Sequence, residues 1–113
     1  MKYAHEVILC VVNAGFSDAV MDAAKEFGAR GGTVIRARGT ANTDAEKLFG
    51  ISVQPEKEIV MILVDTKIKD DILNALYTAV GLKTPGQGIA FCLPVDEVVG
   101  LAEEAPKKNE TKS

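Results

Sequence analysis

Two arginines, Arg36 and Arg38, occupy alternate positions in residues 33–38, which read TVIRAR. This alternation predicts a half-exposed strand, so both guanidinium groups should extend from the same face. A pair of guanidinium groups can hold a carboxylate or a phosphate through charge-assisted hydrogen bonds. The alternative is a solvated face of an edge strand, which is the more common outcome in a small sheet protein.

Two glycine-rich turns are further candidates for anion binding. They read RGGT (residues 30–33) and TPGQG (residues 84–88), and each precedes an expected strand. Backbone without a Cβ atom can bring several N–H groups to bear on one anion, although each turn alone is first of all a chain reversal. The two together indicate a ligand cleft. Because the strands that follow them can lie at opposite edges of a sheet, the turns could face each other across a subunit interface.

Residue types that serve catalysis or metal binding do not occur at suitable spacing. The single histidine, His5, has no spaced serine or cysteine nucleophile to serve, and His, Asp and Glu do not cluster as metal ligands do. Cys10 and Cys92 lie alone in apolar stretches. We expect both to be reduced core residues, with a disulfide as the less favoured alternative if their strands are adjacent. The sequence therefore favours a non-enzymatic protein without a metal.

A polar stretch of unusual length, residues 39–57, separates two expected strands. Loops longer than about 12–15 residues in a compact domain are usually functional or disordered. Within this stretch the segment LFGI places Leu48, Phe49 and Ile51 among polar residues, where apolar side chains are unfavourable unless something covers them. The cover could be the same subunit, a neighbouring copy or a partner protein, so these three residues are a candidate partner-binding site.

Four strands are expected, at residues 6–12, 33–38, 59–64 and 89–93, and Pro94 should end the last one. With a helix after the first and third strands, the element order is βαββαβ. Right-handed crossovers place both helices on one face of an antiparallel sheet, which predicts an α+β, ferredoxin-like sandwich. Three of the strands are continuous apolar runs, so the uncovered face should pack against other copies in a homo-oligomer.

Apolar residues at helical spacing predict the two helices. Ser17 should cap the first helix, and Gly28 should end it in a left-handed conformation. Asp65 or Thr66 should cap the second helix, and Gly81 should end it.

Composition limits the class of protein. The 113 residues are 47% hydrophobic and 5% aromatic, with a formal net charge of −3. We expect one domain, residues 1–102, followed by a polar and disordered tail, residues 103–113. The negative charge argues against nucleic acid as a partner. With neither a run of roughly 18 apolar residues nor a signal-peptide pattern, the chain is expected to be cytoplasmic.

Three segments together resemble the PII signal-transduction family: GARGGTV (residues 28–34), EIVMILV (residues 58–64) and PGQGIAFCLPV (residues 85–95). With the βαββαβ order, the resemblance covers nearly all of residues 6–101. It implies a cytoplasmic homotrimer of ferredoxin-like subunits, with nucleotide clefts between subunits and a long loop that engages a partner such as a transport protein or an enzyme. Together with the arginine pair, it makes the candidate ligand-binding residues Gly31, Thr33, Arg36, Arg38, Leu63, Gly86, Gln87 and Gly88.

The chain departs from the family pattern where the family holds phosphates. Ile89 stands in place of a lysine, Gly100 and Ala102 stand in place of two arginines, and Met61 replaces an acidic residue. Because those cations make charge-assisted hydrogen bonds to a triphosphate, their loss argues against ATP and leaves AMP, ADP or another small anion. The long loop also lacks the family's Gly-x-Gly-x-Gln motif and has no tyrosine to modify, so the chain is similar to divergent PII-like proteins that accompany membrane transport proteins.

Two hypotheses about function follow from these observations. In the first, the protein is a PII-like regulator that binds a small effector between subunits. Binding shifts residues 39–57 between ordered and disordered states, and this loop in turn regulates a partner. In the second, the protein binds no ligand and docks on a membrane transport protein through Leu48, Phe49 and Ile51.

Overall fold

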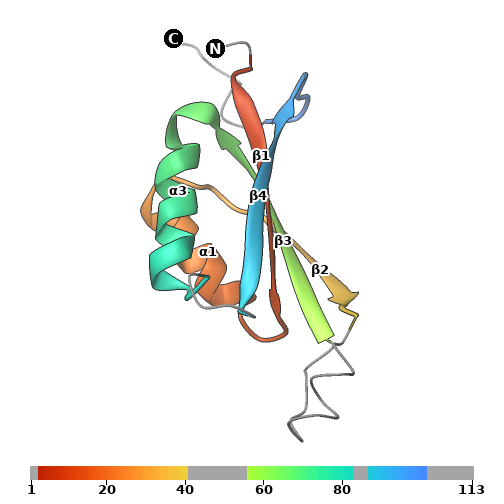
Figure 1. Cartoon of the computed structure of the whole chain (residues 1–113). Helices are drawn as coiled ribbons and strands as arrows, with labels where there is room; N and C mark the ends of the chain where they lie inside the picture. Colours follow the sequence, from red (N-terminus) through yellow and green to blue (C-terminus); the bar gives the residue numbers. More distant parts are fainter. Residues whose placement is uncertain (1–2, 41–55, 83–86, 102–113) are drawn as a thin grey trace, which may run out of the picture.

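The structure, a computed structural model, describes residues 3–40, 56–82 and 87–101. Within these residues the elements follow one another in the predicted βαββαβ order (Figure 1). They are β1 (His5–Asn13), α1 (Ser17–Glu26), β2 (Thr33–Arg38), β3 (Glu56–Asp65), α3 (Thr66–Ala79) and β4 (Gly88–Val95).

The strands form one sheet in the order β2-β3-β1-β4, and each neighbouring pair is antiparallel. Figure 1 shows the sheet nearly edge-on, with α1 and α3 both packed on the same face. The predicted α+β sandwich, with two helices on one face of an antiparallel sheet, is therefore confirmed.

The core lies between the helices and the covered face of the sheet. Alternate residues of β1 and β3 point to this face, as the two-residue period of a strand requires. Each aliphatic side chain buried there contributes about 1.5–3 kcal/mol relative to full exposure. The largest buried side chains are Ile8, Val12, Val20, Val60, Ile62, Ile72 and Leu76.

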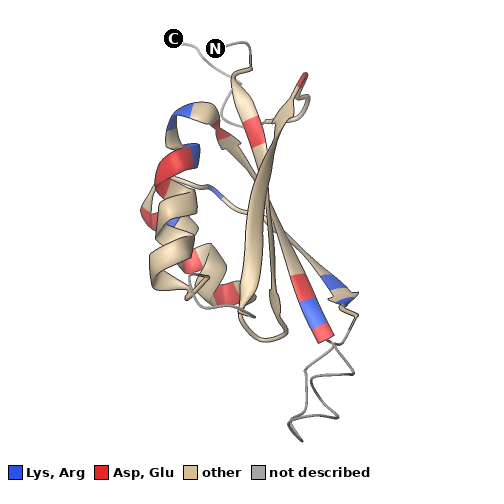
Figure 2. Cartoon of the chain, in the orientation of Figure 1, with Lys and Arg blue, Asp and Glu red and all other residues tan. Residues whose placement is uncertain are grey.

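Neither of the two helices that the structure describes lies over the opposite face of the sheet, and this face is apolar. Strand register places three large side chains of the edge strand β4 there, with exposed fractions of 59% for Ile89, 42% for Phe91 and 48% for Leu93. Half-buried side chains of the central strands continue the surface: Val7, Leu9, Val11, Ile59, Met61 and Leu63. Figure 2 shows long uncharged stretches of sheet, with charges gathered mainly on the helices and at the strand ends. We call these β1, β3 and β4 residues the open face.

The second helix begins and ends as predicted. Asp65 caps α3, since its carboxylate accepts a hydrogen bond of 2.9 Å from the backbone N–H of Lys67. Gly28 and Gly81, beyond the ends of α1 and α3, have φ angles of 108° and 87°, in the left-handed region.

The start of α1 differs from the prediction, because Ser17 is not a side-chain cap. Ser17 is the first helical residue, and no side chain of the N-cap position makes a capping bond. The cap comes from β3 instead, where a Glu58 carboxylate oxygen accepts hydrogen bonds from the N–H groups of Gly15 and Ser17, at 3.1 and 3.3 Å.

Pro94 does not end the last strand, contrary to the prediction. It lies within β4 and is paired with Glu6 of β1. Because β4 is at the edge of the sheet, a residue without an N–H group is tolerated there.

The two thiols are free, as predicted. The register pairs Cys92 with Ile8 and Cys10 with Ala90, so the two cysteines are diagonal neighbours on β1 and β4. Diagonal Cβ atoms are farther apart than the roughly 3.5–4.5 Å that a disulfide requires. Burial raises the pKa of the Cys10 thiol to about 11. Burial, with a hydrogen bond to Glu6, also raises the pKa of the Cys92 thiol. Both thiols are therefore poor nucleophiles near neutral pH.

Several predictions lie outside the described residues. The structure does not describe residues 41–55, which include the candidate partner-binding residues Leu48, Phe49 and Ile51. Gly86 and the predicted tail, residues 103–113, also lie outside the described residues. Two residues of the predicted loop belong to β3 instead, because that strand begins at Glu56. In the helices of the described part of the chain, none combines the length and the apolar character needed to cross a membrane.

Candidate ligand cleft and loop base

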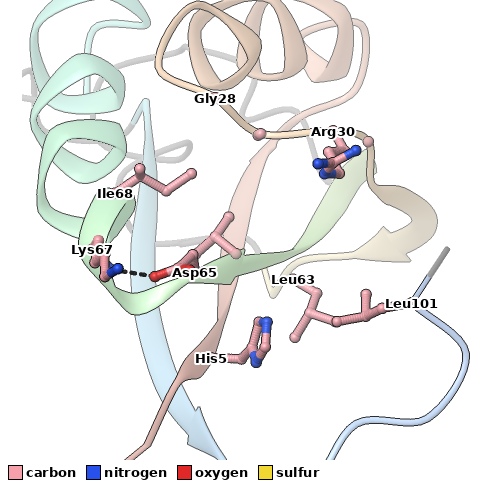
Figure 3. Close-up of a pocket in the computed structure, with 11 residues that line it drawn as sticks. His5, Gly28, Arg30, Leu63, Asp65, Lys67, Ile68 and Leu101 are labelled. Carbon is pink, nitrogen blue, oxygen red and sulfur yellow. Dashed lines mark hydrogen bonds between the residues drawn. The ribbon is translucent and has the colours of Figure 1, made fainter. Parts of the chain in front are cut away.

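A cavity of about 570 Å³ lies where the start of β1, the end of β3 and the start of α3 meet the α1–β2 connection. Its polar lining comes from His5, Arg30, Asp65 and Lys67, and its apolar lining includes Leu63, Ile68 and Leu101. In Figure 3, Arg30 lies on one side of the cavity, Lys67 with Asp65 on a second, and His5 on a third. The size is within the range of about 300–1,000 Å³ common for small-molecule sites.

Hydrogen bonds hold these elements together at the cavity. The backbone N–H of Thr66 donates to the carbonyl of Ala4 at 2.9 Å, and the Thr66 hydroxyl donates to the carbonyl of Tyr3 at 3.1 Å. The first residue of α3 is therefore tied to the chain just before His5. As a result, the imidazole of His5 and the first turn of α3 border the same cavity.

A smaller hollow of about 360 Å³ adjoins the cavity, since Gly31 and Leu63 line both. The remaining lining of the hollow is Val7, Gly32, Thr33 and Met61. It lies at the β2 and β3 end of the open face and is mostly apolar, with backbone of the glycine turn along one side. The two hollows therefore adjoin, and one has charged side chains in its lining while the other is mostly apolar.

The second glycine of the RGGT turn is required by close packing. A Cβ atom at Gly32 would lie 2.9 Å from the carbonyl oxygen of Met61 and 3.0 Å from the sulfur of Met21. A Cβ atom at Gly31 would have no neighbouring atom within 4 Å. Gly32 therefore brings the turn against β3, and Gly31 leaves space where the two hollows join.

The predicted ligand-binding residues outside the arginine pair lie at two separate places in one chain. Gly31, Thr33 and Leu63 come together at the smaller hollow. Gln87 and Gly88 lie at the start of β4, across the sheet from β2, and Gly88 lines a different hollow. In a single chain, the RGGT turn before β2 and the start of β4 are therefore at opposite edges of the sheet.

The arginine pair is on the other face of β2 from the hollows. Arg36 pairs with Glu58 and Arg38 with Glu56 across the ladder, and the side chain of Glu58 reaches α1 on the helix-covered face. Thr33 has the opposite parity and faces the smaller hollow. The predicted common face for Arg36 and Arg38 is thus observed, but in one chain this face does not join the hollow at Thr33.

The first residues of β3 are fastened to the β1–α1 turn. The Lys57 ammonium donates to the side-chain carbonyl of Asn13 at 2.6 Å, and the backbone N–H of Ala14 donates to the carbonyl of Glu56 at 3.1 Å. Glu58 adds its two hydrogen bonds to the start of α1. We call this set of contacts the β3 clamp, and it fixes the point where the chain re-enters the sheet after residues 41–55.

Electrostatics favour the charged form of Glu58 in the β3 clamp. The hydrogen bond from the N–H of Gly15 is the largest cause that lowers the pKa of the carboxyl, and contacts with Ser17 and the charge of Arg36 act in the same direction. The carboxylate also lies at the positive end of the α1 dipole, where a negative charge is stabilised.

Two of the positions at which the sequence resemblance implies a cation have uncharged residues in the described part of the chain. Ile89, which stands in place of a lysine, is 59% exposed on the open face, and Gly100 has a φ angle of 99° in the segment after β4. Ala102 lies outside the described residues. In the described ranges no group of three or more His, Cys, Asp or Glu side chains is placed to hold a metal ion.

Comparison with protein families agrees with the sequence resemblance. The sequence model of the family described as nitrogen regulatory protein P-II matches residues 6–105. The chain belongs to the P-II family. Comparison with curated protein sequences gives no match.

Solved structures of PII proteins share the fold. PII from Arabidopsis thaliana bound to citrate superimposes with a TM-score of 0.68 at 20% identity, over 96% of this chain and 89% of that one. CPII from Thiomonas intermedia K12, bound to ADP, AMP and acetate, gives 0.63 at 10% identity, over 82% and 87%. A PII-like signalling protein from Thermus thermophilus gives 0.61 at 18% identity, over 84% and 91%.

Sequence reasoning missed the polar residues of the larger cavity. In the sequence His5 has no catalytic partner, Arg30 enters only as part of the RGGT turn, and Lys67 is not among the candidate ligand-binding residues, because the three positions lie far apart in the sequence. A signal was available at two of the three positions. Arg30 is inside the family-like GARGGTV segment, and Lys67 is a cation in the first turn of a helix, where the helix dipole disfavours positive charge.

Proposed function

We propose that the protein is a cytoplasmic, non-enzymatic PII-like signalling protein. In this proposal it assembles as a homotrimer, binds a small effector in the clefts between subunits and acts on a partner through residues 39–57. The effector is an adenine nucleotide with few phosphates, AMP or ADP, or another small anion. The domain responsible is residues 1–102.

The observation that carries the proposal is the pair of adjoining hollows at the edge of the exposed apolar open face. An exposed apolar surface of this kind marks an interaction site in a stable protein. Packing of open faces between copies would cover Phe91 and Leu93 and would place a second subunit beside the two hollows. The start of β4, with Gln87 and Gly88, could then approach the RGGT turn of a neighbouring copy, which one chain alone does not allow.

Ligands of the related structures support the choice of effector. The Thiomonas CPII is bound to ADP, AMP and acetate, and the Arabidopsis PII is bound to citrate. All of these are small anions. An apolar hollow next to a cavity with cationic side chains would suit an adenine ring joined to a short phosphate group.

The β3 clamp supports a role for the long loop in output. It fastens the start of β3 to the start of α1, while on the other side of residues 41–55 the chain leaves β2 at Arg38, the end of the strand opposite to Thr33 and the smaller hollow. A ligand at Thr33 would act on the first residue of β2, and its effect would reach residues 39–57 along that strand, while the β3 clamp holds the start of β3 in place. A partner contact through Leu48, Phe49 and Ile51, including contact with a membrane transport protein, belongs to this part of the proposal.

Two measurements test the proposed function. Native mass spectrometry at micromolar concentration should give three times the chain mass of 12.0 kDa. A thermal-shift panel should show a raised melting temperature with AMP or ADP, because a ligand that binds only the folded state stabilises it. A monomeric mass, or a melting temperature unmoved by the nucleotides and by small organic anions, would contradict the proposal.

A further inference from the structure

The larger cavity collects positively charged side chains from separate elements. Arg30 comes from the α1–β2 connection and Lys67 from the first turn of α3, and His5 adds an imidazole from the start of β1 (Figure 3). We propose that this cavity binds the phosphate group of a nucleoside mono- or diphosphate, with Arg30 and Lys67 as its charge partners and His5 as a hydrogen-bond donor. The proposal rests on the proposed function, and it assigns phosphate recognition to residues outside the glycine turn of β4.

The location of Lys67 favours an anion in the cavity. Lys67 is the second residue of α3, at the end of the helix where the backbone dipole repels a cation. The carboxylate of Asp65, which borders the cavity, already accepts the N–H of Lys67 and serves as the helix cap. A phosphate beside this turn would interact favourably with the Lys67 ammonium and with the positive end of the helix.

The net charge of the cavity lining also favours an anionic ligand. Among the described residues that line it, Arg30 and Lys67 supply two cationic side chains and Asp65 supplies one carboxylate. The lining therefore has a net positive charge, although the whole chain has a formal net charge of −3. Arg30 and Lys67 are both exposed, so their charged groups are accessible to a ligand in the cavity.

The adjoining hollow determines which anion fits. It shares Gly31 and Leu63 with the cavity, and Val7 and Met61 make its floor apolar. A flat apolar group joined to an oxyanion, such as a nucleobase joined through ribose to phosphate, can occupy both parts at once. A triphosphate would need further cations, and Ile89 and Gly100 provide none at the family positions.

Calorimetric titration of the full chain tests the assignment, with AMP, ADP and adenosine as probes. Hydrogen bonds to a charged group contribute enough that losing one weakens binding by about 10- to 100-fold. We expect Arg30→Gln and Lys67→Gln each to weaken AMP and ADP by this factor, and adenosine to change by less than about 2-fold. Lys25→Gln is the matched control, because Lys25 is an exposed cation of the last turn of α1 and does not line the cavity. Melting temperatures of all variants without ligand check that each one folds.

Each outcome bears on one part of the proposal. Equal AMP affinity in the wild type and in both variants would overturn the phosphate assignment and leave nucleotide binding intact. Equal weakening of AMP and adenosine would also overturn it, because the two residues would then act on the shape of the site. Citrate and inorganic phosphate form a separate arm. If they bind and are weakened by Arg30→Gln while no nucleotide binds, the anion site stands and the nucleotide part of the proposed function fails. If no probe binds, both proposals fail.

Discussion

Glu58 and Gly15, 43 residues apart in the sequence, are joined by a hydrogen bond of 3.1 Å from the backbone N–H of the glycine to the carboxylate. The same oxygen accepts from Ser17, so a strand residue caps a helix that has no side-chain cap of its own. The start of α1 and the start of β3 are therefore one structural unit.

Glu58→Gln should lower the melting temperature, since a neutral amide makes weaker hydrogen bonds to the two N–H groups and loses the favourable interaction with the helix dipole. Glu56→Gln is the control, because Glu56 takes part in the β3 clamp through its backbone carbonyl, which the substitution retains. Thermal unfolding followed by circular dichroism measures both variants. Equal melting temperatures for the two would show that the Glu58 carboxylate does not stabilise the fold.

The effect of Glu58→Gln should depend on pH. The pKa of the Glu58 carboxyl is lowered in the folded state, so its contribution to stability is present above the unfolded pKa, whose reference value is 4.5, and is lost as pH falls through the folded pKa. Urea unfolding midpoints of the wild type and of Glu58→Gln should differ at pH 7 and converge toward pH 3. A difference that stays constant over this range would contradict the assignment.

Phe91→Asp should convert the proposed trimer into monomers. Phe91 is 42% exposed on the open face, and a carboxylate there would be buried without a partner if the open faces pack together. Light scattering after gel filtration should give the 12.0 kDa chain mass for this variant. Val99→Asp is the matched control, because Val99 is 98% exposed and lies after β4. If both variants keep the wild-type mass, the open face is not the interface.

Gly32→Ala should destabilise the protein by about 1–3 kcal/mol, because the new methyl group would collide with the Met61 carbonyl and the backbone must move. Gly31→Ala, one residue away, should change stability by less than about 1 kcal/mol, since open space surrounds that position. Urea denaturation measures the pair. Similar costs for the two substitutions would mean that the turn is not packed against β3 as described.

Much of the fold could be predicted from local patterns. The strands follow from apolar runs and alternation, and the end of α1 and both ends of α3 follow from Gly28, Asp65 and Gly81. These signals are local, because a cap or a left-handed glycine acts within a few residues. The cap of α1 was mispredicted because its partner, Glu58, is distant in the sequence. Pro94 was misinterpreted because only the strand order shows that β4 is an edge.

The candidate site was harder to predict. Thr33 and Leu63 could be placed by the family resemblance, but Arg36 and Arg38 could be assigned to the helix-covered face only once the register of β2 on β3 was known. The cationic cavity depends on three elements that meet through tertiary contacts. No spacing in the sequence links His5, Arg30 and Lys67.

Along β1, residues that pack beneath the helices alternate with residues that lie on the open face. Ile8 is fully buried beneath the helices, and its neighbour Leu9 faces the other way. Substitutions at the even positions of the strand should therefore change the folding of a single chain, and in the proposed homotrimer those at the odd positions should change the affinity between copies. A mutational scan of this strand would give two profiles with a period of two residues and opposite phase, and folding and association could then be altered independently.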